Sequence, residues 1–449
     1  MAEVMKSPVA SRPNIKLVNR LSGRLRNRSS TIGVMGLGYV GLPLAVSFAQ
    51  AGLRTVGFEV STSRLDDLSR GHSYIDDLPS AEIKRHQAAG LLSVTAEFDR
   101  LSETDALVIC LPTPLGKAHD PDLSILTSAL ATVAKSLRPG QLIVLSSTTY
   151  PGTTEELALP ALESSGLRAG TDFFLAYSPE RVDPGNQRFS AREIPRVVAG
   201  ITPACGTLAT ELFGLLVDHV YQVPNCRTAE MTKLLENTFR SVNIALVNEM
   251  AIICRKLQID VWDVIDAAST KPFGFMRFEP GPGLGGHCIP IDPAYLAWRL
   301  RTVNYRARFV ELAEDINGMM PEYVANLVAR TLEEAGIPLR GSRILTLGLA
   351  YKRNVSDARE SPAIEIVRAL HARGALVTAH DPYVGEDAFP GFAVLNGKLK
   401  DELIRSQNCV VILTDHASYD WPNILTQARL VVDSRGVTHR LDIGSAVRL

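Results

Sequence analysis

A thiol and a carboxylate stand close together in a stretch rich in glycine and proline, Gly281-Pro-Gly-Leu-Gly-Gly-His-Cys-Ile-Pro-Ile-Asp292. Cys288 can act as a nucleophile once its thiol is deprotonated, and the glycines allow the backbone to approach a ligand closely. A lone cysteine is often only a small buried hydrophobe, but such a thiol needs no flanking glycines and prolines. We therefore predict a nucleophilic Cys288 with the Asp292 carboxylate near it in sequence.

A glycine pattern near the N-terminus predicts a dinucleotide site. A short apolar strand from Thr31 runs into Gly36-Leu-Gly38-Tyr-Val-Gly41, and an apolar helix follows. In that setting the turn admits a pyrophosphate onto the helix N-terminus. The next strand ends at Glu59, whose carboxylate is placed to bind the adenosine ribose and to repel a 2′-phosphate, which favours NAD over NADP. The alternative is a turn that only packs helix on strand.

The chain then continues to alternate between strands and helices. Apolar strands are predicted at 106–111, 141–147, 173–177 and 197–199, with helices at 122–137, 153–165 and 203–217. This spacing predicts an α/β fold with a mostly parallel, doubly wound sheet, in which ligands bind beyond the carboxyl ends of the strands. Three polar segments are expected there and together indicate a lined cleft: Pro112-Thr-Pro114, Ser147-Thr-Thr149 and Ser178-Pro-Glu-Arg-Val-Asp183.

A long helix is predicted from Arg227 to about Leu257. It is long enough to join two domains and to supply a subunit interface. Lys233, Asn237 and Arg240 lie on one face, at i, i+4 and i+7. Such a trio is often only a solvated polar face, but on a mostly buried helix these groups need a partner, and a ligand can provide it.

The C-terminal part predicts further helices and a second α/β domain. Helices are expected at 293–302 and 308–335, the latter interrupted near Pro321. Strands at 343–349, 376–379, 409–413 and 430–432 follow, without a second G-x-G-x-x-G. Lys352, Arg359 and Arg435 fall at the strand ends and loops of this domain. They could be surface charges, but a phosphate-bearing substrate would need such cations.

Composition excludes several classes of function. The net charge is −1 and 21% of residues are charged, so the protein has no overall positive electrostatic field that would attract nucleic acid or an acidic membrane. The six cysteines are scattered, which indicates neither a disulfide framework nor a metal site and favours a reducing cytoplasm. No apolar run reaches the ~18 residues of a membrane span. Residues 1–30 carry seven Lys/Arg against one acid, and we expect a flexible basic tail there.

These parts together predict hydride transfer on a phosphorylated or nucleotide-linked substrate. An enzyme that only interconverts alcohol and ketone has no use for a nucleophilic cysteine. An enzyme that carries an aldehyde on to an acid does, because hydride leaves readily from a thiohemiacetal. We therefore expect an oxidation that passes through a covalent adduct of Cys288.

The ordered motifs resemble those of the UDP-glucose/GDP-mannose dehydrogenase family from about residue 31 onward. The matching segments are Gly36-Leu-Gly-Tyr-Val-Gly41, Leu111-Pro-Thr-Pro114, Ser147-Thr148, Ser178-Pro-Glu180, Lys233 with Asn237, Gly285-Gly-His-Cys288 with Asp292, Gly348-Leu-Ala-Tyr-Lys352, Asp357-Ala-Arg-Glu-Ser361 and Asp433-Ser-Arg435. The resemblance implies two Rossmann-like domains joined by a long central helix. The expected boundaries are an NAD-binding domain at 31–225, a central dimerisation segment with the cysteine loop at 226–336, and a UDP-sugar domain at 337–449.

The family implies a role for particular residues of this chain. Cys288 would hold a thiohemiacetal and then a thioester, Lys233 and Asn237 would stabilise the oxyanion, and Asp292, Glu180 and Thr148 would position or activate water. Contacts to NAD are expected from the glycines Gly36, Gly38 and Gly41 and from Tyr39, Val40, Glu59, Arg64, Thr113, Thr148 and Arg359. Contacts to the UDP-sugar are expected from Arg181, Val182, Lys233, Asn237, Arg240, Gly285, Tyr351, Lys352 and Arg435.

Two departures from the hexose-type pattern bear on the sugar. Pro184 stands where UDP-glucose and GDP-mannose dehydrogenases carry a second Glu, so that role is unfilled or passes to Asp183 or another group. His287 stands before the cysteine, where those relatives have Ser. Both features are similar to the branch that oxidises UDP-N-acetylhexosamines. The family resemblance implies a homodimer or larger homo-oligomer and a role such as polysaccharide biosynthesis, and a natural-product sugar is the alternative pathway.

The resemblance implies oxidation of UDP-N-acetylglucosamine at C6 to the uronate, with two NAD⁺ and one water. UDP-N-acetylmannosamine and UDP-glucose are the alternative substrates, because a difference at C2 is not readable from motifs. An enzyme that stops at the aldehyde is a simpler alternative. A different class of protein, an inactive binder of NAD and sugar nucleotide, is also compatible with the binding motifs.

Overall fold

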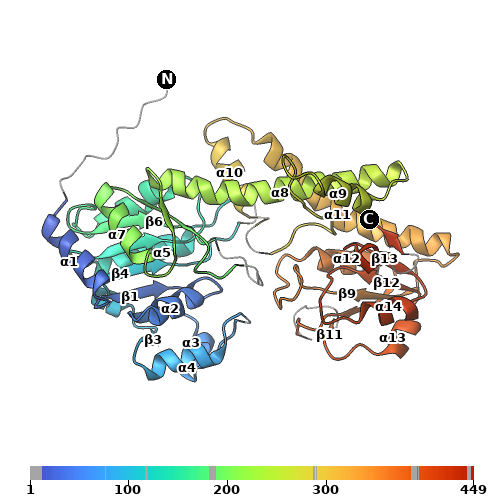
Figure 1. The fold of residues 1–449 in the computed structure, drawn as a ribbon, viewed down its shortest axis with the longest axis horizontal. Helices are drawn as coiled ribbons and strands as arrows, with labels where there is room; N and C mark the ends of the chain where they lie inside the picture. The colour runs from blue at the N-terminus through green and yellow to red at the C-terminus, as the bar shows by residue number, and fades with distance from the viewer. Residues whose placement is uncertain are drawn as a thin grey trace. The chain divides into compact units, whose positions relative to one another are not determined.

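The computed structural model describes residues 13–75, 77–116, 120–181, 189–286, 289, 291–385, 392, 394–441 and 446–449. The chain forms two compact units, one up to Glu236 and one from Asn237 onward. Each unit is built on its own sheet (Figure 1). In the described parts of the chain, no helix combines the length and the apolar character needed to cross a membrane.

The first unit contains an eight-stranded sheet whose strands are short, apolar and almost entirely buried. Neighbouring strands are parallel except where β7 runs antiparallel to β6. Strand order reverses between β1 and β4, and in such sheets ligands bind in the crevice at that point. In spatial order the strands are β3 (Leu92–Thr95), β2 (Arg54–Phe58), β1 (Thr31–Met35), β4 (Ala106–Ile109), β5 (Leu142–Leu145), β6 (Phe174–Tyr177), β7 (Arg196–Gly200) and β8 (Val220–Gln222).

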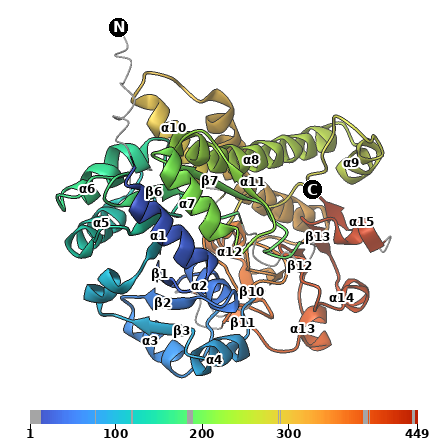
Figure 2. The same cartoon turned by 60° about the vertical axis from the view of Figure 1, so that its left-hand side comes forward.

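Helices cover both faces of this sheet, as predicted for a doubly wound fold. One apolar core joins the sheet to α1 (Ile15–Arg26), α2 (Gly41–Gln50), α4 (Ser80–Ala88) and α7 (Pro203–Phe213). A second core on the other face includes α5 (Ser124–Ser136), a π-helical turn at Thr154–Ala158 and α6 (Leu159–Glu163). α1 and α7 lie side by side in Figure 2, and α3 (Thr62–Ser69) follows β2.

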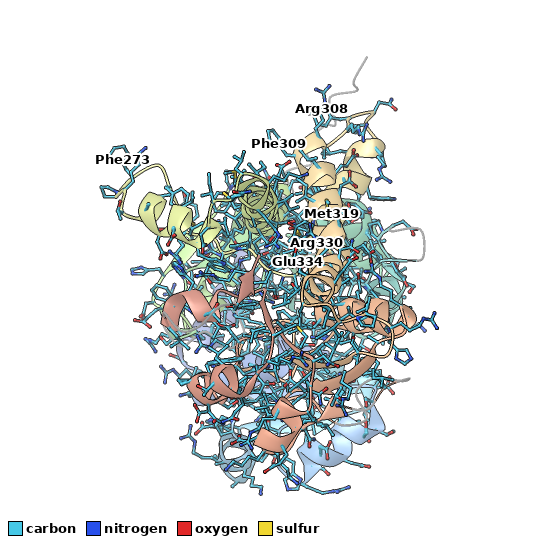
Figure 3. The ribbon with its side chains drawn as sticks, turned by 90° about the vertical axis from the view of Figure 1, so that its right-hand side faces the viewer. Phe273, Arg308, Phe309, Met319, Arg330 and Glu334 are labelled. Carbon is cyan, nitrogen blue, oxygen red and sulfur yellow. The ribbon has the colours of Figure 1, made fainter. Side chains whose placement is uncertain are left out.

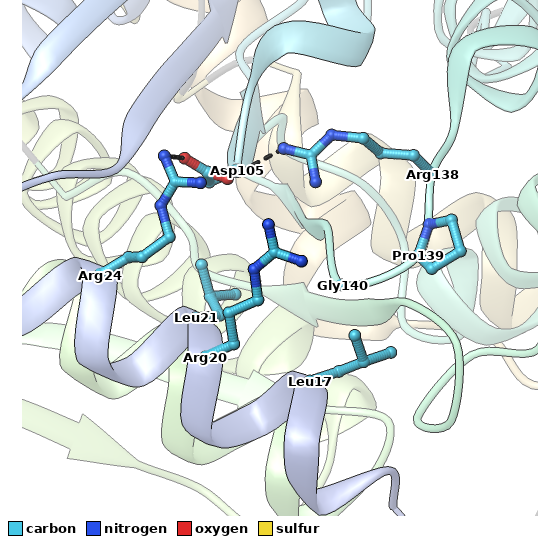
Figure 4. A pocket seen from close by; sticks show the side chains of 8 residues that line it. All are labelled: Leu17, Arg20, Leu21, Arg24, Asp105, Arg138, Pro139 and Gly140. Atoms are coloured by element: carbon cyan, nitrogen blue, oxygen red, sulfur yellow. Dashed lines mark hydrogen bonds and ion pairs between the residues drawn. The ribbon is translucent and has the colours of Figure 1, made fainter.

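The N-terminal segment corrects one prediction. The expectation of a flexible tail over residues 1–30 is wrong for Ile15–Arg26, because this segment forms α1 and buries Leu21 and Leu25 in the core. Its arginines help to dock it. Arg24 pairs with the buried Asp105 at 2.7 Å, and Arg138 pairs with the same carboxylate at 2.9 Å (Figure 4). Arg24 therefore fixes α1 to the edge of the sheet where the strands begin.

The long helix α8 (Cys226–Lys256) has the predicted extent. It is followed by α9 (Val261–Ser269), α10 (Asp292–Arg301) and α11 (Arg308–Glu334), which is seen from Arg308 to Glu334 in Figure 3. The predicted interruption at Pro321 is wrong: α11 continues through it. Pro321 lacks the N–H that would bond the carbonyl of Asn317, but both residues are buried in a packed helix, and packing offsets that loss.

The second unit contains a six-stranded, fully parallel sheet. Its order is β11 (Val394–Leu395), β10 (Leu376–His380), β9 (Arg343–Leu347), β12 (Cys409–Ile412), β13 (Val431–Asp433) and β14 (Val447–Arg448). α12 (Pro362–Ala372) and α11 share one core with the sheet. α13 (Asp401–Arg405) and α14 (Trp421–Gln427) lie on the other face, and α15 (Val437–Leu441) follows β13. The predicted second α/β domain is thus present.

Candidate active site

The dinucleotide loop has the geometry that its glycines predict. Gly36 adopts a positive φ of 87°, which a residue with a side chain rarely does. A Cβ on Gly41 would lie 1.8 Å from the carbonyl oxygen of Gly36, so α2 could not begin as close to β1 with any other residue there. A Cβ on Gly38 would meet nothing within 4 Å. The loop therefore leaves open space beside its backbone, and the residues present fit a bound pyrophosphate.

Glu59 lies at the end of β2, next to this loop. Its buried carboxylate accepts hydrogen bonds from the backbone N–H of Leu37 at 3.1 Å and of Ser61 at 3.0 Å. Arg64 approaches the same carboxylate at 3.4 Å from the first turn of α3. Glu59 and Arg64 thus lie together at the predicted ribose site, and Tyr39 and Val40 are exposed on the glycine loop itself.

The loops that follow β4 and β5 are tied to each other. The hydroxyl of Thr113 donates to the carbonyl of Thr148 at 2.7 Å, and the N–H of Leu111 donates to Ser147 Oγ at 2.9 Å. Both loops lie at the carboxyl ends of strands on the β4 side of the crevice. The structure therefore brings the predicted Thr113 and Thr148 together.

Glu230 is a functional candidate that the sequence reasoning missed. This fully buried residue of α8 accepts hydrogen bonds from the N–H of Gly152 at 2.6 Å and from the N–H and hydroxyl of Thr154. Burial raises the pKa of its carboxyl to about 7, and the hydrogen bonds oppose that rise. Glu230 therefore fixes the turn that follows Thr148. It lies three residues before Lys233, and extending the predicted polar face backward would have found it.

Glu180 and Arg181 follow β6, at the same edge of the sheet. Glu180 pairs with Arg196 at 2.8 Å. Arg181 donates to the carbonyl of Pro195 at 2.6 Å and pairs with Glu236 at 2.6 Å, so its guanidinium already has acceptors. The predicted Val182, and with it the Asp183 and Pro184 positions, lie outside the described residues.

Two of the three predicted polar residues of α8 are buried. Lys233 is 9% exposed and Asn237 is 8% exposed, whereas Arg240 is exposed. No described group accepts a hydrogen bond or forms an ion pair with the Lys233 ammonium. A buried ammonium needs an anionic or polar partner, and a developing oxyanion is such a partner.

Asn237 and Asp292 meet in the second unit. The side-chain amide of Asn237 donates to the carboxylate of Asp292, which is buried in the first turn of α10. The structure therefore joins two predicted catalytic residues that stand 55 positions apart. The thiol of Cys288, and the preceding His287, lie outside the described residues.

Two buried asparagines hold the start of the glycine-rich stretch. Asn248 of α8 accepts a hydrogen bond from the N–H of Gly281 at 2.9 Å and donates to Asn317 of α11 at 2.9 Å. Asn317 in turn donates to the carbonyl of Ser241. Neither asparagine was singled out from the sequence. Asn248 follows Asn237 by eleven residues on the same helical face, which is a signal that could have found it.

The glycines of this stretch pack against the C-terminal domain. A Cβ on Gly285 would lie 2.7 Å from Tyr351 Cβ, and the N–H of Gly286 donates to the carbonyl of Arg359. A Cβ on Gly281 would lie 2.8 Å from the Arg435 guanidinium. The predicted Gly285, Tyr351, Arg359 and Arg435 are therefore neighbours of one loop.

The cations of the C-terminal domain differ in their surroundings. Arg435 donates to the carbonyl of Leu413 at 2.7 Å, and burial lowers the pKa of its guanidinium. Arg359 pairs with Asp357 at 2.7 Å, and Lys352 is half-buried in the loop after β9. Asp381, at the end of β10, accepts the N–H groups of Leu349 and Ala350. This carboxylate therefore holds the loop that follows β9.

Comparison with known sequences gives three matches in order along the chain. Residues 30–217 match the UDP-glucose/GDP-mannose dehydrogenase family, NAD binding domain. Residues 227–319 match the central domain of the same family, and residues 345–440 match its UDP binding domain. The predicted family and the predicted cofactor, NAD, are thereby confirmed.

Individual relatives cover most of the chain. A UDP-N-acetyl-D-glucosamine 6-dehydrogenase of Pseudomonas aeruginosa is 37% identical over 81% of this chain and 85% of that protein. A UDP-N-acetyl-D-mannosamine dehydrogenase of Pyrococcus horikoshii is 34% identical over 93% of this chain and 98% of that protein. The solved structure of UDP-D-ManNAc dehydrogenase from Pyrococcus horikoshii superposes with a TM-score of 0.82 at 35% identity, covering 90% and 95% of the two chains. The chain therefore belongs to the UDP-glucose/GDP-mannose dehydrogenase family and is an NAD-dependent UDP-sugar dehydrogenase.

Proposed function

We propose that the enzyme oxidises UDP-N-acetylglucosamine at C6 to UDP-N-acetylglucosaminuronate. The observation that carries this proposal is the 37% identity to a UDP-N-acetyl-D-glucosamine 6-dehydrogenase. UDP-N-acetylmannosamine is the second candidate, because a relative and a solved structure at 34% and 35% identity are dehydrogenases of that sugar. The sequence departures at Pro184 and His287 support an acetamido sugar over glucose.

The reaction takes four electrons from C6 in two steps. When bound, NAD⁺ accepts a hydride in each step, and two NAD⁺ are used per sugar. The Cys288 thiol adds to the C6 aldehyde to give a thiohemiacetal, which loses hydride to become a thioester. Water then attacks the thioester carbon, the carbon–sulfur bond breaks, and the uronate and the free thiol are released.

Particular side chains suit the charges that develop in these steps. We assign the stabilisation of the oxyanion to the buried Lys233 ammonium and to the Asn237 side chain. Asp292 holds Asn237 in place through their hydrogen bond. Thr148 and Glu180 are assigned to the positioning or activation of the attacking water. The UDP-sugar contacts are assigned to Arg181, Val182, Arg240, Gly285, Tyr351, Lys352 and Arg435, with Arg359 next to either ligand.

We also infer that the enzyme is a homodimer or a larger oligomer formed through α8. From Asn237 onward, this helix buries one apolar face in the core and also exposes a second apolar stripe, which an ordinary surface helix does not. Asn237 and Asn248 are buried, whereas Phe239, Leu246 and Ile253 are exposed and recur every seven residues. A second copy of the same helix would cover this stripe. On α11, Phe309 and Met319 are exposed as well (Figure 3).

We also propose the domain boundaries and the compartment of the enzyme. We retain an NAD domain at 31–225, a central segment at 226–336 and a UDP-sugar domain at 337–449. The five described cysteines are buried free thiols, which supports a protein that functions in a reducing cytoplasm.

The sugar is tested by comparing initial rates of NADH formation with UDP-N-acetylglucosamine, UDP-N-acetylmannosamine and UDP-glucose. We expect kcat/KM for UDP-N-acetylglucosamine to exceed the other two by about tenfold or more, on the scale of discrimination by one pocket group. Cys288→Ala is the control and should give no uronate. A preference for either other sugar would overturn the assignment, and no NADH with any of them would favour an inactive binding protein.

A further inference from the structure

A buried arginine lies at the same edge of the first sheet as the predicted water-activating residues. β7 runs antiparallel to β6, so its first residue, Arg196, lies where β5 and β6 end. All other neighbouring pairs in this sheet are parallel, and a parallel β7 would have placed Arg196 at the opposite edge. The reversed direction of β7 thus delivers a cation to the edge that carries Thr148 and Glu180.

The guanidinium of Arg196 is fixed on three sides and on its face. Nη1 bonds Glu180 Oε2 at 2.8 Å, Nε donates to Ser178 Oγ at 3.0 Å and Nη2 donates to Ser146 Oγ at 3.0 Å. The ring of Phe213 lies 4.4 Å below it. The side chain of Arg196 is only 8% exposed. A planar guanidinium held in this way cannot follow a moving carboxylate, so the carboxylate must orient to it.

The two serines have a fixed hydrogen-bonding polarity. Ser146 donates its own hydroxyl proton to the carbonyl of Ser178 at 2.7 Å, and Ser178 donates its proton to the carbonyl of Val197 at 2.9 Å. Both oxygens therefore present lone pairs to Arg196. The cation is oriented before any ligand binds.

Glu180 is held from both of its oxygens. Oε2 accepts from Arg196, and Oε1 accepts the N–H of Arg181 at 2.9 Å. Pro184 stands where hexose-type relatives have a second Glu, so that residue cannot share this task. The orientation of Glu180 is therefore set by Arg196 and by the backbone of Arg181.

We propose that Arg196 is a positioning residue for thioester hydrolysis, acting through Glu180. The inference rests on the proposed function. Arg196 holds the Glu180 carboxylate turned so that it accepts a proton from the attacking water as that water adds to the thioester carbon. The Cys288 thiolate then leaves and takes up a proton, and no electrons are transferred in this step. Arg196 has no part in the two hydride transfers.

The test separates hydride transfer from hydrolysis in Arg196→Met. Enzyme, NAD⁺ and UDP-N-acetylglucosamine are mixed rapidly, NADH is followed by absorbance, and intact-protein mass is recorded on quenched samples. We expect a burst of two NADH per active site. The steady-state turnover that follows should be about 100-fold slower than that of wild type, which is the typical loss of rate when a catalytic group is misplaced. The acyl adduct on Cys288 should accumulate. Glu180→Gln should behave alike, and the double variant should be no slower than either.

Controls distinguish positioning from damage to the fold. Arg138→Met removes another carboxylate-paired arginine from the opposite edge of the same sheet and should leave the ratio of burst to turnover at the wild-type value. Arg196→Lys keeps the charge and should recover part of the turnover. If Arg196→Met does not fold, Arg196→Lys decides: a retained burst with slower turnover supports the role, and unchanged turnover overturns it.

The outcomes also separate this inference from the proposed function. If Arg196→Met lowers the amplitude of the NADH burst as much as the steady-state rate, and no acyl adduct accumulates, Arg196 is only structural and the inference is wrong. If the wild-type enzyme itself forms no NADH with the three UDP-sugars, the proposed function fails instead.

Discussion

Glu230 is the residue whose ionisation the fold influences most directly near the candidate site. Burial raises the pKa of its carboxyl from 4.5 to about 7. Between these values the folded protein keeps a proton that the unfolded chain has lost, so this carboxyl contributes less stability as pH rises through that window. A pKa shift of this size corresponds to a change of about 3 kcal/mol in the free energy of unfolding.

We therefore predict that Glu230→Gln removes a pH dependence of thermal stability. The variant loses one acceptor for Gly152 and Thr154, which costs about 1–3 kcal/mol. Relative to wild type, its melting temperature should be lower at pH 5.5 and should recover toward pH 8. Differential scanning fluorimetry at several pH values measures this, with the exposed Glu97→Gln as control. A difference in melting temperature that is constant with pH would contradict the prediction.

At the scale of single residues, the sequence predicted the functional residues that belong to a motif or a regular spacing within one segment. Glu59 followed from its place at the end of the second strand, and Lys233 with Asn237 followed from helical spacing. Glu230 and Arg196 were missed because their partners, Gly152 and Glu180, are distant in sequence. A buried ion pair or cap of this kind is decided by tertiary packing. For Glu230 the local sign was its helical spacing before Lys233, and for Arg196 the sequence analysis found none.

At the scale of elements, the start of α2 gives a matched pair of glycine variants. Gly41→Ala places a Cβ 1.8 Å from a backbone oxygen, so the strand and helix must move apart. We expect a large loss of stability, in the range of about 3 kcal/mol or more, together with loss of NAD binding. Thermal unfolding and NAD titration by calorimetry test this.

Gly38→Ala is the control for this prediction, because its Cβ has open space. We expect this variant to fold with a melting temperature near that of wild type, and to bind NAD more weakly because the methyl group occupies the approach to the pyrophosphate. Equal stability of the two alanine variants would show that the close contact at Gly41 does not exist.

The elements themselves were largely predictable, and their mutual arrangement was not. Apolar runs placed the strands to within a few residues, for example 106–111 against Ala106–Ile109. The reversed direction of β7 was not predicted, because it depends on pairing between distant segments. α1 was mistaken for a tail because its arginines outweigh its short apolar stripe, yet Leu21 and Leu25 are enough to dock it.

At the scale of the whole molecule, the exposed apolar stripe of α8 predicts how copies associate. Leu246 lies in the middle of this stripe and is 54% exposed. Replacing it by Glu in both copies would bury two charges against apolar surface, which costs several kcal/mol. We predict that Leu246→Glu dissociates the oligomer, as measured by size-exclusion chromatography with light scattering.

The matched control is Ile125→Glu on α5, where an apolar side chain is 42% exposed outside this stripe. It should leave the oligomer intact. If Leu246→Glu keeps the mass of wild type, or if wild type is monomeric at micromolar concentration, the proposed interface is wrong.

The covalent four-electron mechanism is tested most directly by the number of NADH formed per UDP-N-acetylglucosamine consumed. The reaction is run to completion with excess NAD⁺, NADH is read by absorbance, and the product is identified by mass spectrometry. A covalent four-electron oxidation predicts two NADH per sugar and a C6 carboxylate. One NADH per sugar with an aldehyde product would contradict the role given to Cys288 and the hydrolytic role given to Glu180.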